Sequence, residues 1–203
     1  MSVTPDTAHG AAASAHAVAN EQAATSARNA IEGQTAASAF SAHTSASEQA
    51  ASHHGGPIFK AMCAADLNEV ERVERLVYAH PWSINNFHDS LVSGYQCQVA
   101  RDAVGNLLGY FLLMHAPDES HLLNITLLPS AQGCGFGRML IEQACAVARS
   151  LGSPAILLEV RPSNTHALAV YLHVGFVRIG VRKGYYPAAA QQREDAIVMK
   201  LVL

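Results

Sequence analysis

Features that would assign this 203-residue sequence to several broad classes are missing. Lysine and arginine total 13 against 16 acidic residues, so the chain has no excess positive charge for nucleic acid or an anionic membrane. The longest strongly apolar run, residues 107–114, is far shorter than the roughly 20 residues of a membrane-spanning helix. The N-terminus resembles neither a secretory signal nor an arginine-rich transit peptide. We therefore expect a cytoplasmic protein that binds neither nucleic acid nor membrane directly.

Metal-binding patterns are missing as well. The cysteines show no C-x-x-C or comparable zinc-ligand spacing, and we interpret them as reduced thiols. His53 and His54 are adjacent, but they lie in a segment of small residues that fixes no coordination geometry. We therefore expect no metal ion. The four cysteines are Cys63, Cys97, Cys134 and Cys145.

The composition divides the chain into two parts. Residues 1–57 hold 18 alanines, a single aromatic residue and five charged residues, and they show no sustained apolar period. Such a segment cannot bury enough apolar surface to offset its ordering entropy, so we expect a disordered extension. Residues 58–203 contain 12 basic and 12 acidic residues and nearly all the large apolar side chains. We expect this second part to form one domain.

The second part alternates helical and strand-like patterns. Apolar residues recur at helical spacing over 66–78 and 135–151. Ser83 can cap a short helix over 83–91, and residues 164–174 are predicted as a helix that ends at Gly175. Strand-like runs cover 97–101, 107–114, 121–128, 155–160, 177–182 and 196–201, and the run 155–160 is apolar enough for a strand covered on both faces. This order predicts an α/β (α+β) fold with a mixed central sheet flanked by helices.

A glycine-rich loop joins the third of these strands to the third helix. Gly133, Gly135 and Gly137 let the backbone approach a ligand closely, and the helix that follows presents unpaired N–H groups with a partial positive charge. This combination favours a pyrophosphate site. The G-x-G-x-G spacing is neither the dinucleotide fingerprint nor a Walker loop. The alternative is a turn that only lets strand and helix pack closely.

Several motifs resemble one enzyme family. Residues 132–137, Gln-Gly-Cys-Gly-Phe-Gly, fit the Q/R-x-x-G-x-G/A signature of the GCN5-related N-acetyltransferase (GNAT) family. Further matches at 80–83, 158–161, 169–176, 185–187 and 193–199 are similar to the RimI-type ribosomal-protein-alanine N-acetyltransferases. The resemblance covers residues 58–203. It implies the GNAT fold and transfer of an acetyl group from acetyl-CoA to the N-terminal alanine of a small-subunit ribosomal protein, by a monomeric enzyme.

The same resemblance assigns the residues that bind acetyl-CoA. The loop would hold the pyrophosphate, the backbone of the preceding strand would pair with the pantetheine and polarise the thioester carbonyl, and Asn164 would contact the cofactor arm unless it only caps its helix. Gly133 and Cys134 replace basic or amide side chains common in relatives, which leaves Arg138 to contact the outer phosphates. The implied set is Ile125, Thr126, Leu127, Gln132, Gly133, Cys134, Gly135, Phe136, Gly137, Arg138 and Asn164.

Two residues are candidates for acid–base chemistry. Glu159 is the one carboxylate in the apolar run 154–160, so it could deprotonate the acceptor amine directly or through water. Its alternative is an ion pair with Arg161 or another cation. Tyr171 follows twelve residues later on a helix and, by resemblance, protonates the departing thiolate. Its alternative is a position in the core.

The acceptor side is less defined. Trp82, Tyr185 and Tyr186 could hold the acceptor peptide or could only cover the core. Glu194 and Asp195 could attract a basic acceptor or be solvated. Two alternative functions stay open: acetylation of another protein terminus or a small amine, and a non-catalytic acetyl-CoA-binding module.

Overall fold

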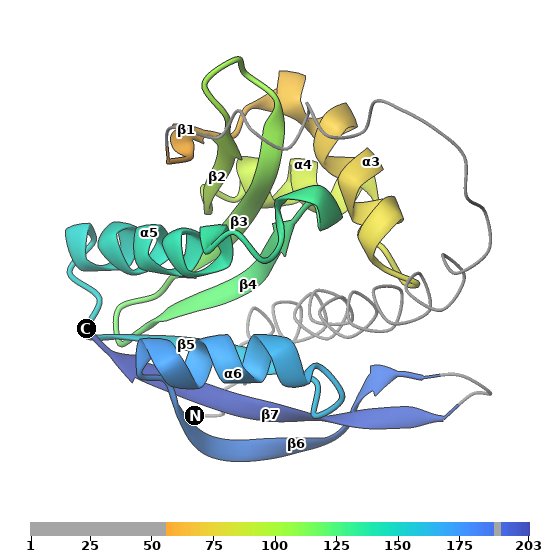
Figure 1. Ribbon diagram of the computed structural model, residues 1–203. Coiled ribbons are helices and arrows are strands. Elements are labelled where there is room, and N and C mark those ends of the chain that lie inside the picture. The colour runs from red at the N-terminus through yellow and green to blue at the C-terminus, as the bar shows by residue number, and fades with distance from the viewer. Residues whose placement is uncertain (1–55, 189–191) are drawn as a thin grey trace, which may run out of the picture.

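The computed structural model describes residues 56–188 and 192–203. The predicted disordered extension, residues 1–57, lies outside the described residues apart from its last two positions. The described ranges fold into one sheet with helices on both of its faces (Figure 1). The helices are α3 Leu67–Val77, α4 Ile84–Val92, α5 Phe136–Ser150 and α6 Thr165–Val174, with short 3₁₀ turns at Ala64–Asp66 and Pro129–Ala131.

Seven strands form the sheet in the order β1-β2-β3-β4-β5-β7-β6. Neighbouring strands run antiparallel except β4 and β5, which are parallel, so the predicted mixed sheet is confirmed. The strands are β1 Ile58–Ala61, β2 Gln96–Arg101, β3 Leu107–His115, β4 Ser120–Leu127, β5 Ala155–Val160, β6 Val177–Pro187 and β7 Arg193–Val202.

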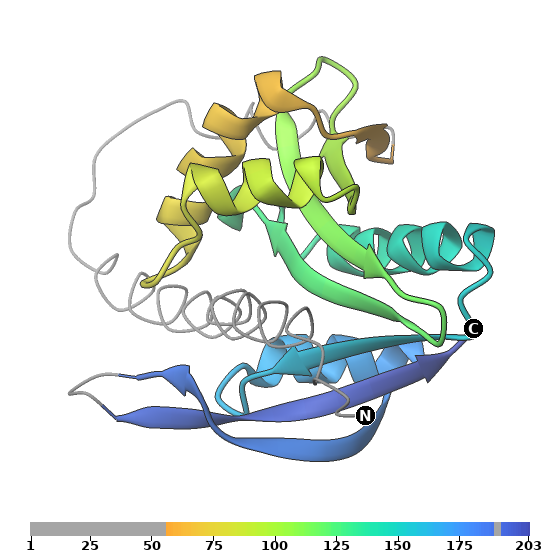
Figure 2. The same ribbon diagram turned by 180° about the vertical axis from the view of Figure 1, so that it is seen from behind.

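Strand β3 shows how the sheet divides the core. Its residues Phe111 and Leu113 pack in the apolar cluster that includes α5 and α6, whereas Tyr110 and Leu112 pack in the cluster that includes α3 and α4. Successive side chains of a strand point to opposite faces, so the two clusters lie on opposite sides of the sheet. Figures 1 and 2 show these two faces in turn.

The parallel pair β4 and β5 separates soon after it begins. The two strands pair only at Ser120 with Ile156 and at His121 with Leu157. Strand β4 continues to Leu127 and β5 to Val160 without further pairing to each other, and their ribbons diverge (Figure 1). One edge of β4 therefore faces away from any neighbouring strand at its C-terminal end.

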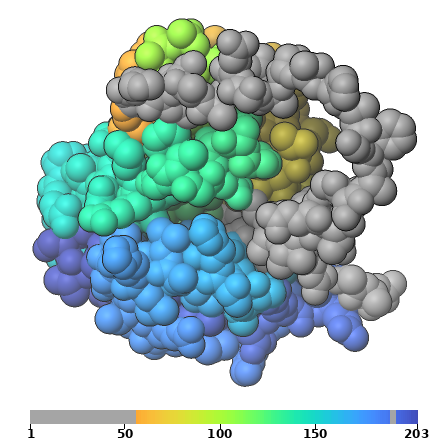
Figure 3. All heavy atoms as spheres, viewed as in Figure 1, coloured from red at the N-terminus to blue at the C-terminus, as the bar shows by residue number. Residues whose placement is uncertain are grey.

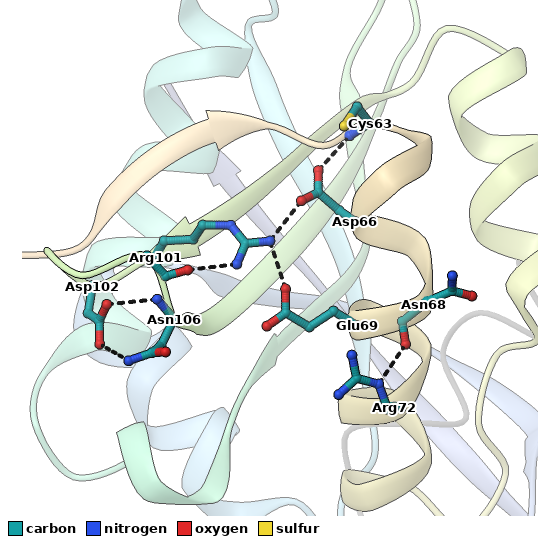
Figure 4. Close-up of polar contacts among 9 residues, drawn as sticks. Cys63, Asp66, Asn68, Glu69, Arg72, Arg101, Asp102 and Asn106 are labelled. Carbon is teal, nitrogen blue, oxygen red and sulfur yellow. Dashed lines mark hydrogen bonds and ion pairs between the residues drawn. The ribbon is translucent and has the colours of Figure 1, made fainter.

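An ion-pair cluster fixes the start of α3 against β2 (Figure 4). The Nη2 atom of Arg101 lies 2.7 Å from Asp66 Oδ1 and 2.8 Å from Glu69 Oε2. The other carboxylate oxygen of Asp66 accepts the backbone N–H of Cys63 at 2.8 Å. These bonds orient α3 across the sheet and carry its C-terminal end, followed by Tyr78, toward the separated strands.

The sequence prediction differs from the structure at the edges of the sheet. Strand β1 was not predicted; it is four residues long, mostly exposed, and defined by its pairing with β2. Strand β6 extends to Pro187, beyond the predicted end at residue 182, because a register shift against β7 lets it continue through Gly184. Within the described ranges, no helix has the length and apolar character needed to cross a bilayer.

Candidate active site

A cavity of about 780 Å³ lies at the separation of β4 and β5. Its walls come from the C-terminal end of β4, the glycine-rich loop with the start of α5, the exposed face of α6, and the residues Val77 and Tyr78 at the end of α3. Helices α5 and α6 lie side by side on the face of the molecule shown in Figure 3. This volume is within the range of small-molecule and cofactor pockets.

The glycine-rich loop forms one end of the cavity. Gly133 and Gly135 have φ angles of +77° and +82°, in the left-handed region that L side chains rarely adopt. A Cβ atom at either position would have nothing within 4 Å, so the loop backbone is open to a ligand. Gly135 is the N-cap of α5, a 15-residue helix, and the helix is fixed by burial of Phe136 against Leu108. The loop thus aims the N-terminal N–H groups of a helix at the cavity.

The edge of β4 forms the floor. Thr126 and Leu127 pair with Tyr110 and Gly109 of β3 on one side, and on the other side they line the cavity together with Ile125. Strand backbone of this kind can pair with an extended ligand, as an added strand would.

Most of the predicted cofactor-binding residues meet in this cavity. Cys134 and Phe136 do not line it: Cys134 is exposed, with its Sγ 3.6 Å from the Gln132 carbonyl oxygen, and Phe136 is buried in the core. Asn164 caps α6, its Oδ1 accepting the Ala167 N–H at 3.1 Å, so the capping role is observed and its amide nitrogen is left for a ligand. The predicted residues that line the cavity are Ile125, Thr126, Leu127, Gln132, Gly133, Gly135, Gly137, Arg138 and Asn164.

Tyr171 lines the same cavity from α6. Its side chain is 5% exposed, and its ring centroid lies 5.6 Å from that of Phe176. Burial raises the pKa of Tyr171 well above its ordinary value, so the hydroxyl keeps its proton at neutral pH. A protonated hydroxyl facing a cavity can serve as a proton donor.

Glu159 lies on β5, is 6% exposed, and does not line the cavity. Its Oε1 lies 3.0 Å from Nη2 of Arg182 on β6, so the alternative of an ion pair with another cation is observed. Burial, followed by the negative charge of Glu159, raises the pKa of Tyr186 well above its ordinary value, and Tyr171 acts in the same direction.

The three aromatic candidates for the acceptor site do not line the cavity. Trp82 is 4% exposed and packs 5.2 Å from Phe87, in the core between α3, α4 and the sheet. Tyr185 and Tyr186 pack edge to face, with centroids 5.1 Å apart. The hydroxyl of Tyr186 is buried and has no hydrogen-bond partner in the described part of the chain. All three side chains are buried among apolar neighbours, and their contact with an acceptor peptide stays a prediction.

The acidic pair of β7 is neither free nor simply solvated. Glu194 lies 3.1 Å from Nη1 of Arg161 and accepts the Ser163 N–H at 2.9 Å. Asp195 lies 2.7 Å from Nζ of Lys183 and accepts the Gly184 N–H at 2.8 Å. Glu194 therefore ties β7 to the segment between β5 and α6, and Asp195 ties β7 to β6.

Sequence reasoning missed Tyr78, which lines the cavity opposite the loop. Its hydroxyl lies 2.8 Å from Thr126 Oγ1. It also missed Glu74, a fully buried carboxylate on α3 that accepts the backbone N–H of Trp82 at 3.1 Å. In the helical pattern Glu74 occupies an ordinary polar position, and Tyr78 only marks the end of the helix. In the described residues we find no cluster of three or more His, Cys, Asp or Glu side chains arranged to hold a metal ion.

Comparison with known proteins agrees with this geometry. The model of the acetyltransferase (GNAT) family matches residues 64–176. The [ribosomal protein bS18]-alanine N-acetyltransferase of Haemophilus influenzae is 31% identical over 140 residues, which cover 69% of this chain and 94% of that protein. The enzyme of the same name from Escherichia coli K12 is 34% identical over 137 residues, 67% of this chain and 90% of the relative. The crystal structure of the Escherichia coli ribosomal-protein-S18-alanine N-acetyltransferase superposes with a TM-score of 0.67 at 31% identity, covering 72% of this chain and 93% of that one.

Proposed function

Because the chain belongs to the GNAT family of acetyltransferases, we propose that it transfers the acetyl group of acetyl-CoA to the α-amine of an N-terminal alanine, with a small-subunit ribosomal protein as acceptor. One observation carries the proposal: the glycine-rich loop, the edge of β4 and Tyr171 line a single cavity. The names of the relatives supply the acceptor. A monomer acting in the cytoplasm, without direct contact to nucleic acid or membrane, stays a prediction.

The residues of the cavity fit acetyl-CoA. The open backbone at Gly133 and Gly135, together with the N-terminus of α5, would hold the pyrophosphate. Arg138 lines the cavity beside this loop; its Nε pairs with Glu142 at 2.7 Å, which leaves the rest of the guanidinium for phosphate oxygens. The edge of β4 at Ile125–Leu127 would pair with the amide groups of the pantetheine arm. Acetyl-CoA itself supplies the activated acyl group as a thioester.

Proton transfers would fall to Tyr171 and Glu159. As the amine nitrogen bonds to the acetyl carbon and the carbon–sulfur bond breaks, Tyr171 gives its proton to the departing thiolate. Glu159 takes the amine proton through ordered water, because its carboxylate lies outside the cavity lining and is held by Arg182. Backbone N–H groups at the β4 edge would stabilise the charge that develops on the carbonyl oxygen.

The test uses the full chain, acetyl-CoA and a short peptide that begins with alanine. Mass spectrometry should show the gain of one acetyl group at the α-amine. The matched control is the same peptide with a blocked α-amine, which should gain nothing. Cofactor binding without acetylation of any amine would support the non-catalytic module and refute the enzyme. Acetylation of lysine side chains or small amines alone would establish the alternative acceptor class.

A further inference from the structure

Glu74 is a fully buried carboxylate that the proposed chemistry does not use. Three donors converge on it: the Trp82 backbone N–H at 3.1 Å, the Asn124 side-chain amide at 3.4 Å, and the hydroxyl of Tyr110. A buried carboxylate is costly unless it is hydrogen-bonded, and an ionised one can only accept. Backbone and side-chain amide nitrogens can only donate, so Glu74 accepts from both Trp82 and Asn124.

That constraint is passed along a chain of side chains to the cavity. Asn124 turns its amide nitrogen toward Glu74, so its Oδ1 is left to accept the hydroxyl of Thr126 at 2.9 Å. The Thr126 hydroxyl has a single proton, and it is used in this bond to Asn124. Tyr78 lies 2.8 Å from Thr126 Oγ1 and must be the donor of that bond. The carbonyl oxygen of Ile125, 3.4 Å away, is a second acceptor for the same Tyr78 proton.

The chain ends at a residue that faces the cavity. Tyr78 and Thr126 both line it. Burial, followed by the negative charge of Glu74, raises the pKa of Tyr78 well above its ordinary value, so the hydroxyl stays protonated. With its proton directed to Thr126 or Ile125, the Tyr78 oxygen has only lone pairs to offer. It is therefore an acceptor in a cavity where an amine must bind.

We propose that Tyr78 receives an N–H of the acceptor amine and that Glu74 is a positioning residue, which sets the direction of the Tyr78 hydroxyl through Asn124 and Thr126. This inference rests on the proposed function, since it presumes a primary amine as acceptor. Glu74 also holds the Trp82 N–H, and Glu71 Oε1 accepts the Ile84 N–H at 3.1 Å. The C-terminal part of the segment from Tyr78 to Ile84 is thus fixed against α3.

Steady-state kinetics on the full chain test the inference with separate KM values for acetyl-CoA and for the alanine-initiated peptide. Tyr78→Phe keeps the ring and removes the acceptor oxygen. We expect the peptide KM to rise about three- to tenfold, the loss typical of one hydrogen bond, with the acetyl-CoA KM within about twofold of wild type. Thr126→Val should shift the peptide KM in the same direction, and Thr126→Ser, which keeps the hydroxyl, should restore it.

A double-mutant cycle assigns the role of Glu74. Glu74→Gln should raise the peptide KM in the wild-type background and have little further effect in the Tyr78→Phe background, because its influence passes through Tyr78. Ser90→Ala is the control: it removes a buried hydroxyl of α4, which donates to the Asn86 carbonyl oxygen at 2.8 Å and is not part of the chain of side chains from Glu74 to Tyr78. It should lower the melting temperature and leave both KM values unchanged. If Glu74→Gln unfolds the protein, the comparison of Thr126→Val, Thr126→Ser and Ser90→Ala still decides.

The outcomes separate the inference from the proposed function. If the wild type is active and Tyr78→Phe leaves the peptide KM unchanged, or raises only the acetyl-CoA KM, the inference is overturned and the proposed function stands. Equal effects of Thr126→Val and Ser90→Ala on the peptide KM reduce Glu74 to a structural residue. If the wild type acetylates a different amine, the same variants are measured with that amine. If the wild type acetylates no amine, and calorimetry with CoA present detects no binding of an amine, both the inference and the proposed function are overturned.

Discussion

Gly109 of β3 occupies a position where the structure leaves no room for a side chain. A Cβ atom there would lie 2.8 Å from Leu127 Cδ2 and 3.2 Å from Leu127 Cα, and it would overlap the carbonyl oxygen of Thr126. These atoms belong to Thr126 and Leu127, which pair with β3 on one side of β4 and line the cavity on the other. Two of the three are backbone atoms, which cannot move aside as a flexible side chain can. We therefore predict that Gly109→Ala pushes β4 away from β3.

The cost follows from this overlap. Overpacking a buried site by one carbon costs about 1–3 kcal/mol. For a domain of this size each kcal/mol lowers the melting temperature by about 4 °C, so the melting temperature should fall by about 4–12 °C. Displacement of the Thr126 carbonyl would also misplace acetyl-CoA. Errors near 1 Å can reduce rates about 100-fold, so we expect kcat/KM for acetyl-CoA to fall by roughly 10- to 100-fold.

Calorimetry and initial-rate kinetics on Gly109→Ala measure these effects, with Gly180→Ala as control. Gly180 lies in β6, its φ is not positive, and a Cβ atom there would have nothing within 4 Å. That variant should melt at or slightly above the wild-type temperature, because alanine restricts the unfolded chain. If Gly109→Ala melts within about 1 °C of wild type with unchanged kinetics, the close contact of β3 with the cavity edge is refuted.

Four further variants test the site and the fold. Gly135→Ala should lower stability by about 1–2 kcal/mol, because the residue has a φ of +82°, and should raise the Kd for acetyl-CoA by about tenfold. The control Gly152→Ala has a φ of +75° but lies away from the loop, so it should lose as much stability and leave the Kd unchanged in titration calorimetry. Tyr171→Phe should lower kcat by roughly 10²–10⁴-fold with cofactor binding intact, and a loss below threefold would exclude this tyrosine as the acid. Glu159→Gln should lower kcat by a similar factor, while Glu119→Gln, which loses an ion pair with Lys200 at 3.2 Å, should keep full activity. Burial acts to raise the pKa of Asp66, but the Cys63 N–H and Arg101 outweigh it and hold that pKa below its ordinary value. The stabilisation by the Asp66 carboxylate is therefore complete above a pH of about 4 and is lost as the pH falls through the folded-state pKa. Asp66→Asn should lower the free energy of unfolding by about 1 kcal/mol at pH 7 and flatten its dependence on pH below about pH 4. Denaturant titrations that show the same pH dependence of stability in the variant and the wild type would contradict this.

The sequence predicted the interior of the fold better than its edges. Helix α5 follows from its apolar period and from Gly135 at its start, and α6 follows from its end signals at Asn164 and Gly175; all of these are local features. Strand β1 has no such signal, because its four residues are ordered by pairing with a strand nearly 40 residues away. The continuation of β6 depends on a register shift through Gly184, a residue that in sequence indicates a turn.

The same contrast between local and distant information holds for the site. The loop at Gln132–Arg138 is a contiguous motif, so its place in the cavity could be predicted. The positions of Trp82, Tyr185 and Tyr186 are set by packing between distant segments, and the prediction that they face the acceptor found no support in the cavity lining. The burial of Glu74 was also beyond prediction. In the helical pattern it occupies one of several polar positions, and only the docking of α3 onto β3 and β4 encloses it.

The two halves of the cavity are built by different means, and this bears on how acceptor preference is encoded. The half assigned to acetyl-CoA is made of backbone: glycines at left-handed angles, a helix N-terminus and a strand edge. The opposite half is made of side chains at the end of α3, and the direction of the Tyr78 hydroxyl is set by Glu74 through two intervening residues. Substitutions on α3 or in residues 78–84 can therefore change the acceptor while the cofactor site keeps its geometry. Preference for an amine, on this view, is decided by the segment that Glu71 and Glu74 hold against α3.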